Sequence, residues 1–286
     1  MFEILFLFFY NFFFFSSFLL PSLFLQEYFM ERMLYDAVSS GKVEEVKEIL
    51  GGNPTLDVNW KNRDTGWSSL HRACWSDRGS IVSIFLAHPD VDVNLKSDDG
   101  STPFNDSCFK GATSCARLLL MDPRVNVAEP SLSGSTPLFW AAYWGTLGII
   151  KWWISSGREM DFGEPGNGNT DAIGAAMKKG KLEAATLLTR FRENPADTRH
   201  EIRVELGLVD ELAAGVFALM VFVSDGLLKV TEEGQSTTTP TSRFFTIVTQ
   251  LPLELQMVLS YRLLGSAKEL ITATDREIAF KELAKR

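Results

Sequence analysis

The fold of this chain is decided by residues 134–145, which read Gly-Ser-Thr-Pro-Leu-Phe-Trp-Ala-Ala-Tyr-Trp-Gly. Residues 100–111 repeat the same wording, and looser copies start at residue 66 and at residue 168. The leading glycines of the copies, Gly66, Gly100, Gly134 and Gly168, recur every 34 residues. A fixed period of this size indicates an array of stacked structural repeats.

Residues in the repeated stretch have local roles that physical chemistry explains. Thr136 can cap the free N–H groups at the start of a helix, and Pro137 suits the first helical turn, where no N–H is needed. Gly145 permits a left-handed turn after that helix. The pattern therefore predicts a capped helix, a tight turn and a second helix in each period.

The repeated pattern is a glycine, then Thr-Pro-Leu, then small residues in the following helix. It resembles the ankyrin repeat over roughly residues 33–190. The resemblance implies an all-α fold: an ankyrin-repeat solenoid of helix pairs with outward loops, in which neighbours stack because no single unit buries its apolar face. We expect the array at residues 31–190, as a capping unit plus four repeats. The last repeat is degenerate, because Asp171 stands where Pro137 stands in the copy before it.

Two positions of the second repeat carry separate expectations. His71 sits where the family pattern has its histidine, and we expect it to be structural, bonding within its turn. Asp77 replaces the glycine between the two helices, which should leave that turn less tight.

Residues 1–30 form a hydrophobic segment ahead of the array. Residues 4–25 are almost wholly apolar and long enough to span a bilayer. Glu3, rather than a basic residue, precedes them, which disfavours a secretory signal. Four explanations stay open: a mis-called start, with Met30 or Met33 as the true one, a disordered extension, a membrane anchor, or a core helix of the fold.

Beyond the array the period of the repeats is lost. We expect residues 191–200, which contain Asn194-Pro195, to be a linker or helix break, and residues 201–286 to form a small helical module. Within it, residues 251–263 faintly resemble the first helix of an F-box or the end of a SOCS box, which implies a ubiquitin-ligase adaptor. The same letters also make an ordinary helix start, with a proline and Glu254 in the first turn.

Composition and motifs exclude several classes of function. The net charge of −8 argues against a general nucleic-acid binder, which needs a basic stripe for phosphates. The three cysteines form no CxxC pair and the three histidines share no metal-ligand spacing. Nucleotide-binding and hydrolase motifs are absent from the sequence. We therefore expect no enzyme, no cofactor and no metal, and the cysteine usage favours a reducing, cytoplasmic location.

The resemblance implies a module that binds a protein on a concave face made of loop tips and first helices. Carried over by position, Trp75, Phe109, Tyr143 and Met177 lie one period apart and should form one continuous wall. Such rings are typical of hot spots, and acidic loop residues favour a partner with basic residues. The alternative is that the rings fill gaps between repeats or pack against the C-terminal helices. The other candidates are Trp67, Asp98, Asp99, Lys110 and Trp144.

The sequence leaves three functions open. The first is a non-catalytic scaffold that binds another protein or peptide on the concave face. The second is a ubiquitin-ligase substrate adaptor acting through the C-terminal helices. The third is an ankyrin protein tethered to a membrane by residues 4–25.

Overall fold

The computed structural model describes residues 29–163, 171–225, 248, 250–264 and 271–284. The chain divides into two compact units, Met1–Glu193 and Asn194–Arg286. Residues 4–25, and with them the prediction of a membrane anchor, lie outside the described residues. Within the described ranges no single helix is long and apolar enough to cross a bilayer. The helices α11 (Pro195–Glu205) and α12 (Leu208–Ser224) are long and apolar enough only when taken together, and a 98° bend separates them.

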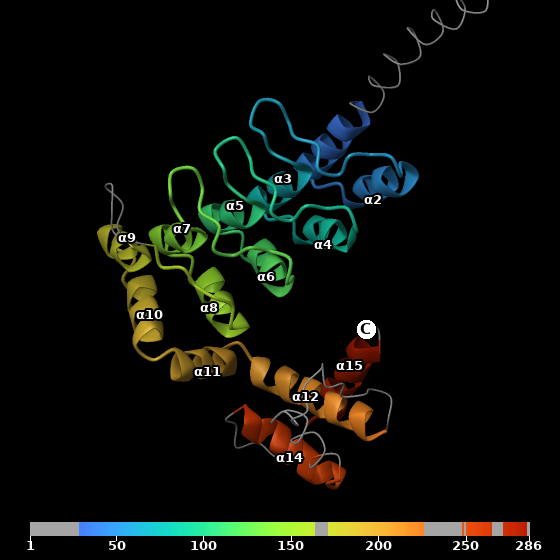
Figure 1. Ribbon diagram of the computed structural model, residues 1–286, viewed down its shortest axis with the longest axis vertical. Coiled ribbons are helices and arrows are strands. Elements are labelled where there is room, and N and C mark those ends of the chain that lie inside the picture. Colours follow the sequence, from blue (N-terminus) through green and yellow to red (C-terminus); the bar gives the residue numbers. More distant parts are fainter. Residues whose placement is uncertain (1–28, 164–170, 226–247, 249, 265–270, 285–286) are drawn as a thin grey trace, which may run out of the picture. The chain divides into compact units, whose positions relative to one another are not determined.

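The first unit is a row of helix pairs, and the loops before α3, α5 and α7 extend to one side of it (Figure 1). First helices pack on first helices, in the order α3, α5, α7, α9, and second helices form a neighbouring row, α2, α4, α6, α8, α10. This arrangement confirms the predicted all-α solenoid. The pairs are residues 29–40 with α2 (Val43–Gly52), α3 (Ser69–Trp75) with α4 (Gly79–Ala87), α5 (Pro103–Lys110) with α6 (Thr113–Met121), α7 (Pro137–Trp144) with α8 (Leu147–Ser156), and α9 (Ala172–Lys178) with α10 (Leu182–Glu193).

The first helix of each repeat starts as the repeated sequence pattern predicts. The Thr136 hydroxyl accepts the N–H of Phe139 at 3.2 Å, and Pro137 fills the first helical position. In the degenerate repeat a carboxylate oxygen of Asp171 accepts the N–H of Gly174 at 2.7 Å. An aspartate one position after the threonine site thus caps α9, which keeps the helix start satisfied.

The glycines that lead each repeat occupy equivalent corners of successive loops. Gly66, Gly100 and Gly134 have φ angles of +65°, +76° and +76°, a region that side chains disfavour. A Cβ on Gly66 would lie 2.1 Å from the carboxylate of Asp98, and one on Gly100 would lie 2.7 Å from Cγ of Leu132. The loops therefore pack closely on one another, and the spacing of the glycines reflects this contact.

Asp77 links the second repeat to the third. Its φ is +49°, the left-handed turn that a glycine would adopt. One oxygen of its carboxylate accepts the hydroxyl of Ser114 at 2.6 Å and the N–H of Cys115 at 3.2 Å. Both donors lie in the first turn of α6, where a negative charge is stabilising. Rather than loosening its turn, as the sequence suggested, Asp77 caps a helix of the next repeat.

We expect Asp77→Ala to lower the free energy of unfolding by about 1–2 kcal/mol, because the cap is lost while an alanine must adopt the left-handed turn. Asp77→Gly should lose about half as much, since glycine relieves the backbone. Urea unfolding followed by tryptophan fluorescence measures both. If the two variants match the wild type, Asp77 contributes nothing as a cap.

The core of the first unit lies between the rows of helices. Leu119, expected in the core, is fully buried. Trp153 is also fully buried: its ring meets the edge of Phe104 at 5.0 Å, and its indole N–H donates to the carbonyl of Glu159 at 2.9 Å. The contact joins a first helix, α5, to the second helix of the next repeat, α8, so this ring fixes the stacking of two repeats.

The predicted linker at residues 191–200 is helical except at one residue. α10 continues to Glu193, and α11 begins at Pro195. Asn194 separates them, and its side-chain oxygen accepts the N–H of Asp197 at 3.4 Å. Because proline is favoured at the first position of a helix and asparagine is a good cap, the same dipeptide ends one helix and starts the next.

The second unit packs α14 (Leu253–Leu263) and α15 (Ala273–Ala284) against α12. Its buried cluster includes Phe217 of α12 and Tyr261 of α14. The helix α14 contains most of residues 251–263, the segment that faintly resembles part of an F-box or SOCS box. Leu253 and Leu255 on this helix are about half exposed. The adaptor role of this segment stays a prediction.

Candidate functional site

Seven aromatic side chains form a continuous row along α3, α5 and α7 and the loop before α3. We call this row the aromatic wall. Its members come from three successive repeats, so the stacking of the repeats creates it. They are Trp67, Trp75, Phe109, Phe139, Trp140, Tyr143 and Trp144.

The first half of the aromatic wall is a chain of direct ring contacts. The centroids of Trp67 and Trp75 are 4.8 Å apart, and Trp75 stacks on Phe109 at 5.5 Å with 14° between the planes. Phe109 then meets Trp140 at 4.8 Å and Trp144 at 5.7 Å, both edge to face. Aromatic pairs in these geometries attract one another, so the rings hold each other in position.

The second half reaches Tyr143 through its neighbours on α7. Trp140 and Trp144 lie 5.8 Å and 5.1 Å from the ring of Tyr143. The predicted stripe therefore runs directly from Trp75 to Phe109, and the ring contacts of Phe109 then pass to Tyr143 through these two tryptophans. Met177, the last member of the stripe, lies on α9 and is 57% exposed.

The aromatic wall is accessible to a partner. Trp144 is 46% exposed and the other six rings are half-buried. Two lysines cover parts of it: Nζ of Lys110 lies 4.5 Å from the centroid of Trp75, and Nζ of Lys179 lies 4.5 Å from that of Tyr143. These ring faces therefore already attract cations within the chain.

A pocket of about 320 Å³ opens beside the aromatic wall, and four of its rings line it, Trp67, Trp75, Phe109 and Trp140. Loop residues of two repeats, among them Asp99 and residues 131–133, also line it. Asn105 and Asp106 belong to the lining although they are only 1% and 4% exposed, so they form its bottom.

The two polar residues at the bottom of the pocket are incompletely paired. Asn105 donates its amide N–H to the carbonyl of Glu129 at 2.9 Å, but its Oδ1 accepts no hydrogen bond. Oδ2 of Asp106 is also buried without a partner. Burial, reinforced by the negative charge of Asp99, raises the pKa of Asp106 to about 8. Such unpaired buried oxygens are uncommon in folded proteins and call for an explanation.

The predicted acidic pair lies on the loop between α4 and α5. Asp98 and Asp99 are exposed. The carboxylate of Asp99 accepts the hydroxyl of Ser97 at 2.5 Å and the N–H of Ser101 at 3.1 Å. Burial alone would raise the pKa of Asp99, but these hydrogen bonds outweigh it and hold the pKa below its ordinary value. Asp99 is therefore a fixed negative charge beside the pocket.

Two polar residues of the pocket and two rings of the wall escaped the sequence reasoning: Asn105, Asp106, Phe139 and Trp140. Asn105 stands one period after His71, and Trp140 stands one period after Asp106. The available signal was the pair of polar residues in the first turn of α5, at positions where α7 has Phe139 and Trp140. Their burial follows from rings and loops of neighbouring repeats, which a single period does not show.

His71 is a structural residue, as expected from its position. It is fully buried; Nδ1 accepts the backbone N–H of Ser68 at 3.2 Å, and Nε2 lies 3.1 Å from the carbonyl of Ser101 in the next repeat. Burial lowers the pKa of His71 to about 4, so the ring is neutral at physiological pH. Its contacts extend beyond its own turn and tie two loops together.

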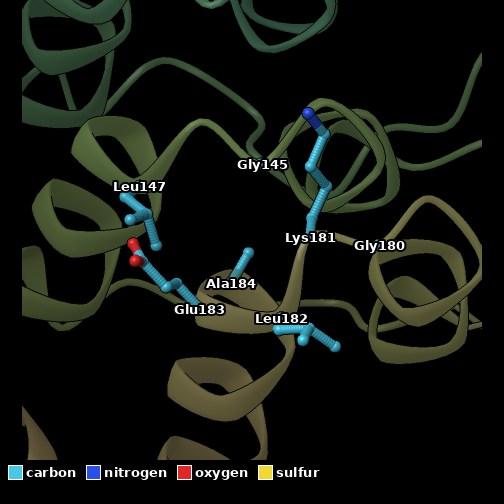
Figure 2. Close-up of a pocket in the computed structure, with 7 residues that line it drawn as sticks. All are labelled: Gly145, Leu147, Gly180, Lys181, Leu182, Glu183 and Ala184. Carbon is cyan, nitrogen blue, oxygen red and sulfur yellow. The ribbon is translucent and has the colours of Figure 1, made fainter.

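A second hollow, of about 300 Å³, lies at the turns of the last two repeats. In Figure 2, Lys181 extends toward Gly145, and Glu183 extends toward Leu147. The hollow thus combines one basic and one acidic side chain with leucines, and it offers no preference for either charge. The pocket at Asp106 has the more specific chemistry.

A row of stacked helix pairs with an exposed aromatic face defines the first unit as a helical repeat array. The family of ankyrin repeats, described as three copies, matches residues 34–129 and 76–164. The human 2-5A-dependent ribonuclease is 35% identical over 72 residues, which cover 25% of this chain and 9% of that protein. This chain thus matches less than a tenth of the length of that relative.

The first unit therefore carries ankyrin repeats over residues 34–164, and its helix pairs stack as an ankyrin-repeat solenoid. Ankyrin repeats are modules of protein–protein interaction, and this chain carries such a module. The ribonuclease activity in the name of the relative belongs to that protein, and the short match gives no ground to transfer it.

Proposed function

We propose that this chain is a non-catalytic scaffold that binds a partner protein or peptide on the aromatic wall and the loop tips beside it. The observation that carries the proposal is the wall: large rings packed on one another, half-buried, with Trp144 46% exposed. Rings held by their neighbours lose little conformational freedom on binding, and tryptophan and tyrosine dominate hot spots.

The charges beside the wall favour a partner with basic residues. Asp64, Asp98 and Asp99 lie on loops next to the wall, and all three are exposed. The chain as a whole carries a net charge of −8. Charge complementarity of this kind speeds encounter with a basic partner and sets its orientation more than it sets affinity.

The double substitution Trp75→Ala and Trp144→Ala is expected to abolish partner capture, with a loss of affinity on the order of 100-fold, because each ring is a hot-spot candidate. Neither ring is fully buried, so the melting temperature should shift by no more than about 5 °C. Affinity purification with mass spectrometry identifies the partners of the full chain, and titration of the purified pair gives the change in affinity.

Trp152→Ala is the matched control for this experiment. Its ring lies on α8, 4.1 Å below the guanidinium of Arg117 and outside the aromatic wall. Capture should survive this change. If the double variant retains its partners, the rings are not the binding site. If the double variant unfolds, the rings belong to the core.

A further inference from the structure

The pocket beside the aromatic wall combines two features that attract positive charge. The rings of Trp67, Trp75, Phe109 and Trp140 line it, and aromatic rings attract cations to their faces. Asp106 adds a carboxyl group at its bottom. Ring faces around an acidic group are the arrangement that recognises organic cations.

We propose that this pocket binds one cationic side chain of the partner, an ammonium or guanidinium group, with Asp106 as its counter-charge. The inference rests on the proposed function, because it names the group that the partner inserts beside the wall. It is more specific than a preference for basic partners, since it assigns one side chain to one pocket.

The unpaired oxygens are a second observation that leads to the same ligand. Oδ1 of Asn105 and Oδ2 of Asp106 are buried acceptors without donors. An ammonium group has three donors and a guanidinium group has five, and neither has an acceptor. Such a group supplies what both residues lack, whereas an anion would meet a carboxyl group and the fixed charge of Asp99.

Two cations of the neighbouring and the same helix, Arg72 and Lys110, are engaged by other groups. Arg72, one period before Asp106, donates its Nε–H to the hydroxyl of Ser39 at 3.0 Å. Lys110, on the same helix as Asp106, lies over the ring of Trp75. These contacts of the two cations are therefore with groups other than Asp106, and a group from outside the chain can serve as its counter-charge.

Cation binding should be coupled to the ionisation of Asp106. In the empty pocket burial holds its pKa at about 8, and a cation beside it favours the charged form. The groups around it do not titrate between pH 6 and 8. Asp99 stays charged, His71 stays neutral, and burial raises the pKa of Tyr35 and that of Cys108 above their ordinary values.

The test titrates the full chain, labelled with ¹⁵N at tryptophan, with three blocked amino acids: lysine, arginine and Nε-acetyl-lysine. We expect saturable shifts of the indole signals of Trp67, Trp75 and Trp140 with lysine or arginine, with a dissociation constant on the order of millimolar. Acetyl-lysine, which is neutral, should bind at least about 10-fold more weakly. Comparison of lysine with arginine identifies the preferred cation.

Asp106→Asn should weaken lysine and arginine by roughly 10-fold or more, because a charged partner is lost while the shape is kept. Asp90→Asn is its matched control: it removes a carboxylate from an exposed loop position outside the pocket and the wall, and should change affinity little. For the wild type, affinity should rise with pH by up to about 10-fold per unit between pH 6 and 8. The pH dependence should vanish in Asp106→Asn.

Equal binding of acetyl-lysine and lysine would overturn the inference, and so would the absence of saturable shifts. Either result leaves partner capture by the wall intact. The opposite outcome is also distinguishable. If lysine binding depends on Asp106 but the Trp75 and Trp144 double variant still retains its partners, the proposed function is wrong and the cation pocket stands.

Discussion

Asp106 is expected to lower the free energy of unfolding of the first unit by roughly 3–5 kcal/mol between about pH 4 and about pH 8, seen as the difference between the wild type and Asp106→Asn. Burial, together with the charge of Asp99, raises the pKa of Asp106 from its ordinary value of 3.8 to about 8. Between these values the folded state holds a proton that the unfolded state has lost. The stabilising contribution is therefore complete below about pH 4 and is lost as the pH rises through about 8.

The magnitude follows from the size of the shift. Each pH unit between the two pKa values corresponds to about 1.4 kcal/mol. The whole interval would give nearly 6 kcal/mol, and the access of water to the pocket reduces the cost of ionising Asp106. Because a protein of this size is stable by only about 5–15 kcal/mol, this single carboxyl group sets much of the alkaline limit of the array.

Urea unfolding at several pH values, followed by tryptophan fluorescence, measures the effect in the full chain. All seven tryptophans lie in the first unit, so the signal reports that unit alone. Asp99, Asp122 and His71 have lowered pKa values and contribute in the opposite direction, losing stability as the pH falls. The difference between wild type and Asp106→Asn isolates Asp106, and Asp64→Asn serves as control. Parallel pH profiles for wild type and Asp106→Asn would show that Asp106 ionises freely in the fold.

Short-range features of this fold could be predicted from the sequence. The cap at Thr136, the proline after it and the glycine corners depend on residues within a few positions of one another. Repetition of these signals at one spacing made the solenoid predictable, because each copy must pack on the next. The degenerate copy also keeps a cap, because Asp171 accepts the N–H of Gly174 in a helix that starts one position later.

The pocket could not be predicted, because its parts come from different repeats. Asp106 looks like a solvated helix residue in the sequence. The pocket around it also takes rings of the previous repeat and, from the next repeat, residues 131–133 and the ring of Trp140. Asp77 was misjudged for the same reason: the donors it accepts lie in the following repeat. Contacts of this kind depend on the rotation between repeats, which the spacing of glycines does not specify.

Trp153→Ala is expected to lower the free energy of unfolding of the first unit by about 3–5 kcal/mol, the range for truncation of a fully buried large ring. The ring is 0% exposed, and its contact with Phe104 joins α8 to α5. Truncation also leaves the carbonyl of Glu159 without the indole N–H that it accepts at 2.9 Å. The lost area, the cavity and the unpaired carbonyl act in the same direction.

The adjacent tryptophan makes the prediction specific to burial. Trp152 is half-buried and its ring lies under Arg117 on the surface of α8, so Trp152→Ala should cost about 1 kcal/mol. Both variants delete the same side chain one residue apart on the same helix, so helix propensity and composition cancel in the comparison. Urea unfolding of the full chain, followed by far-ultraviolet circular dichroism, gives the two values. Similar losses for the two would mean that the repeats relax around an absent Trp153, and that its contact with Phe104 does not hold α5 and α8 together.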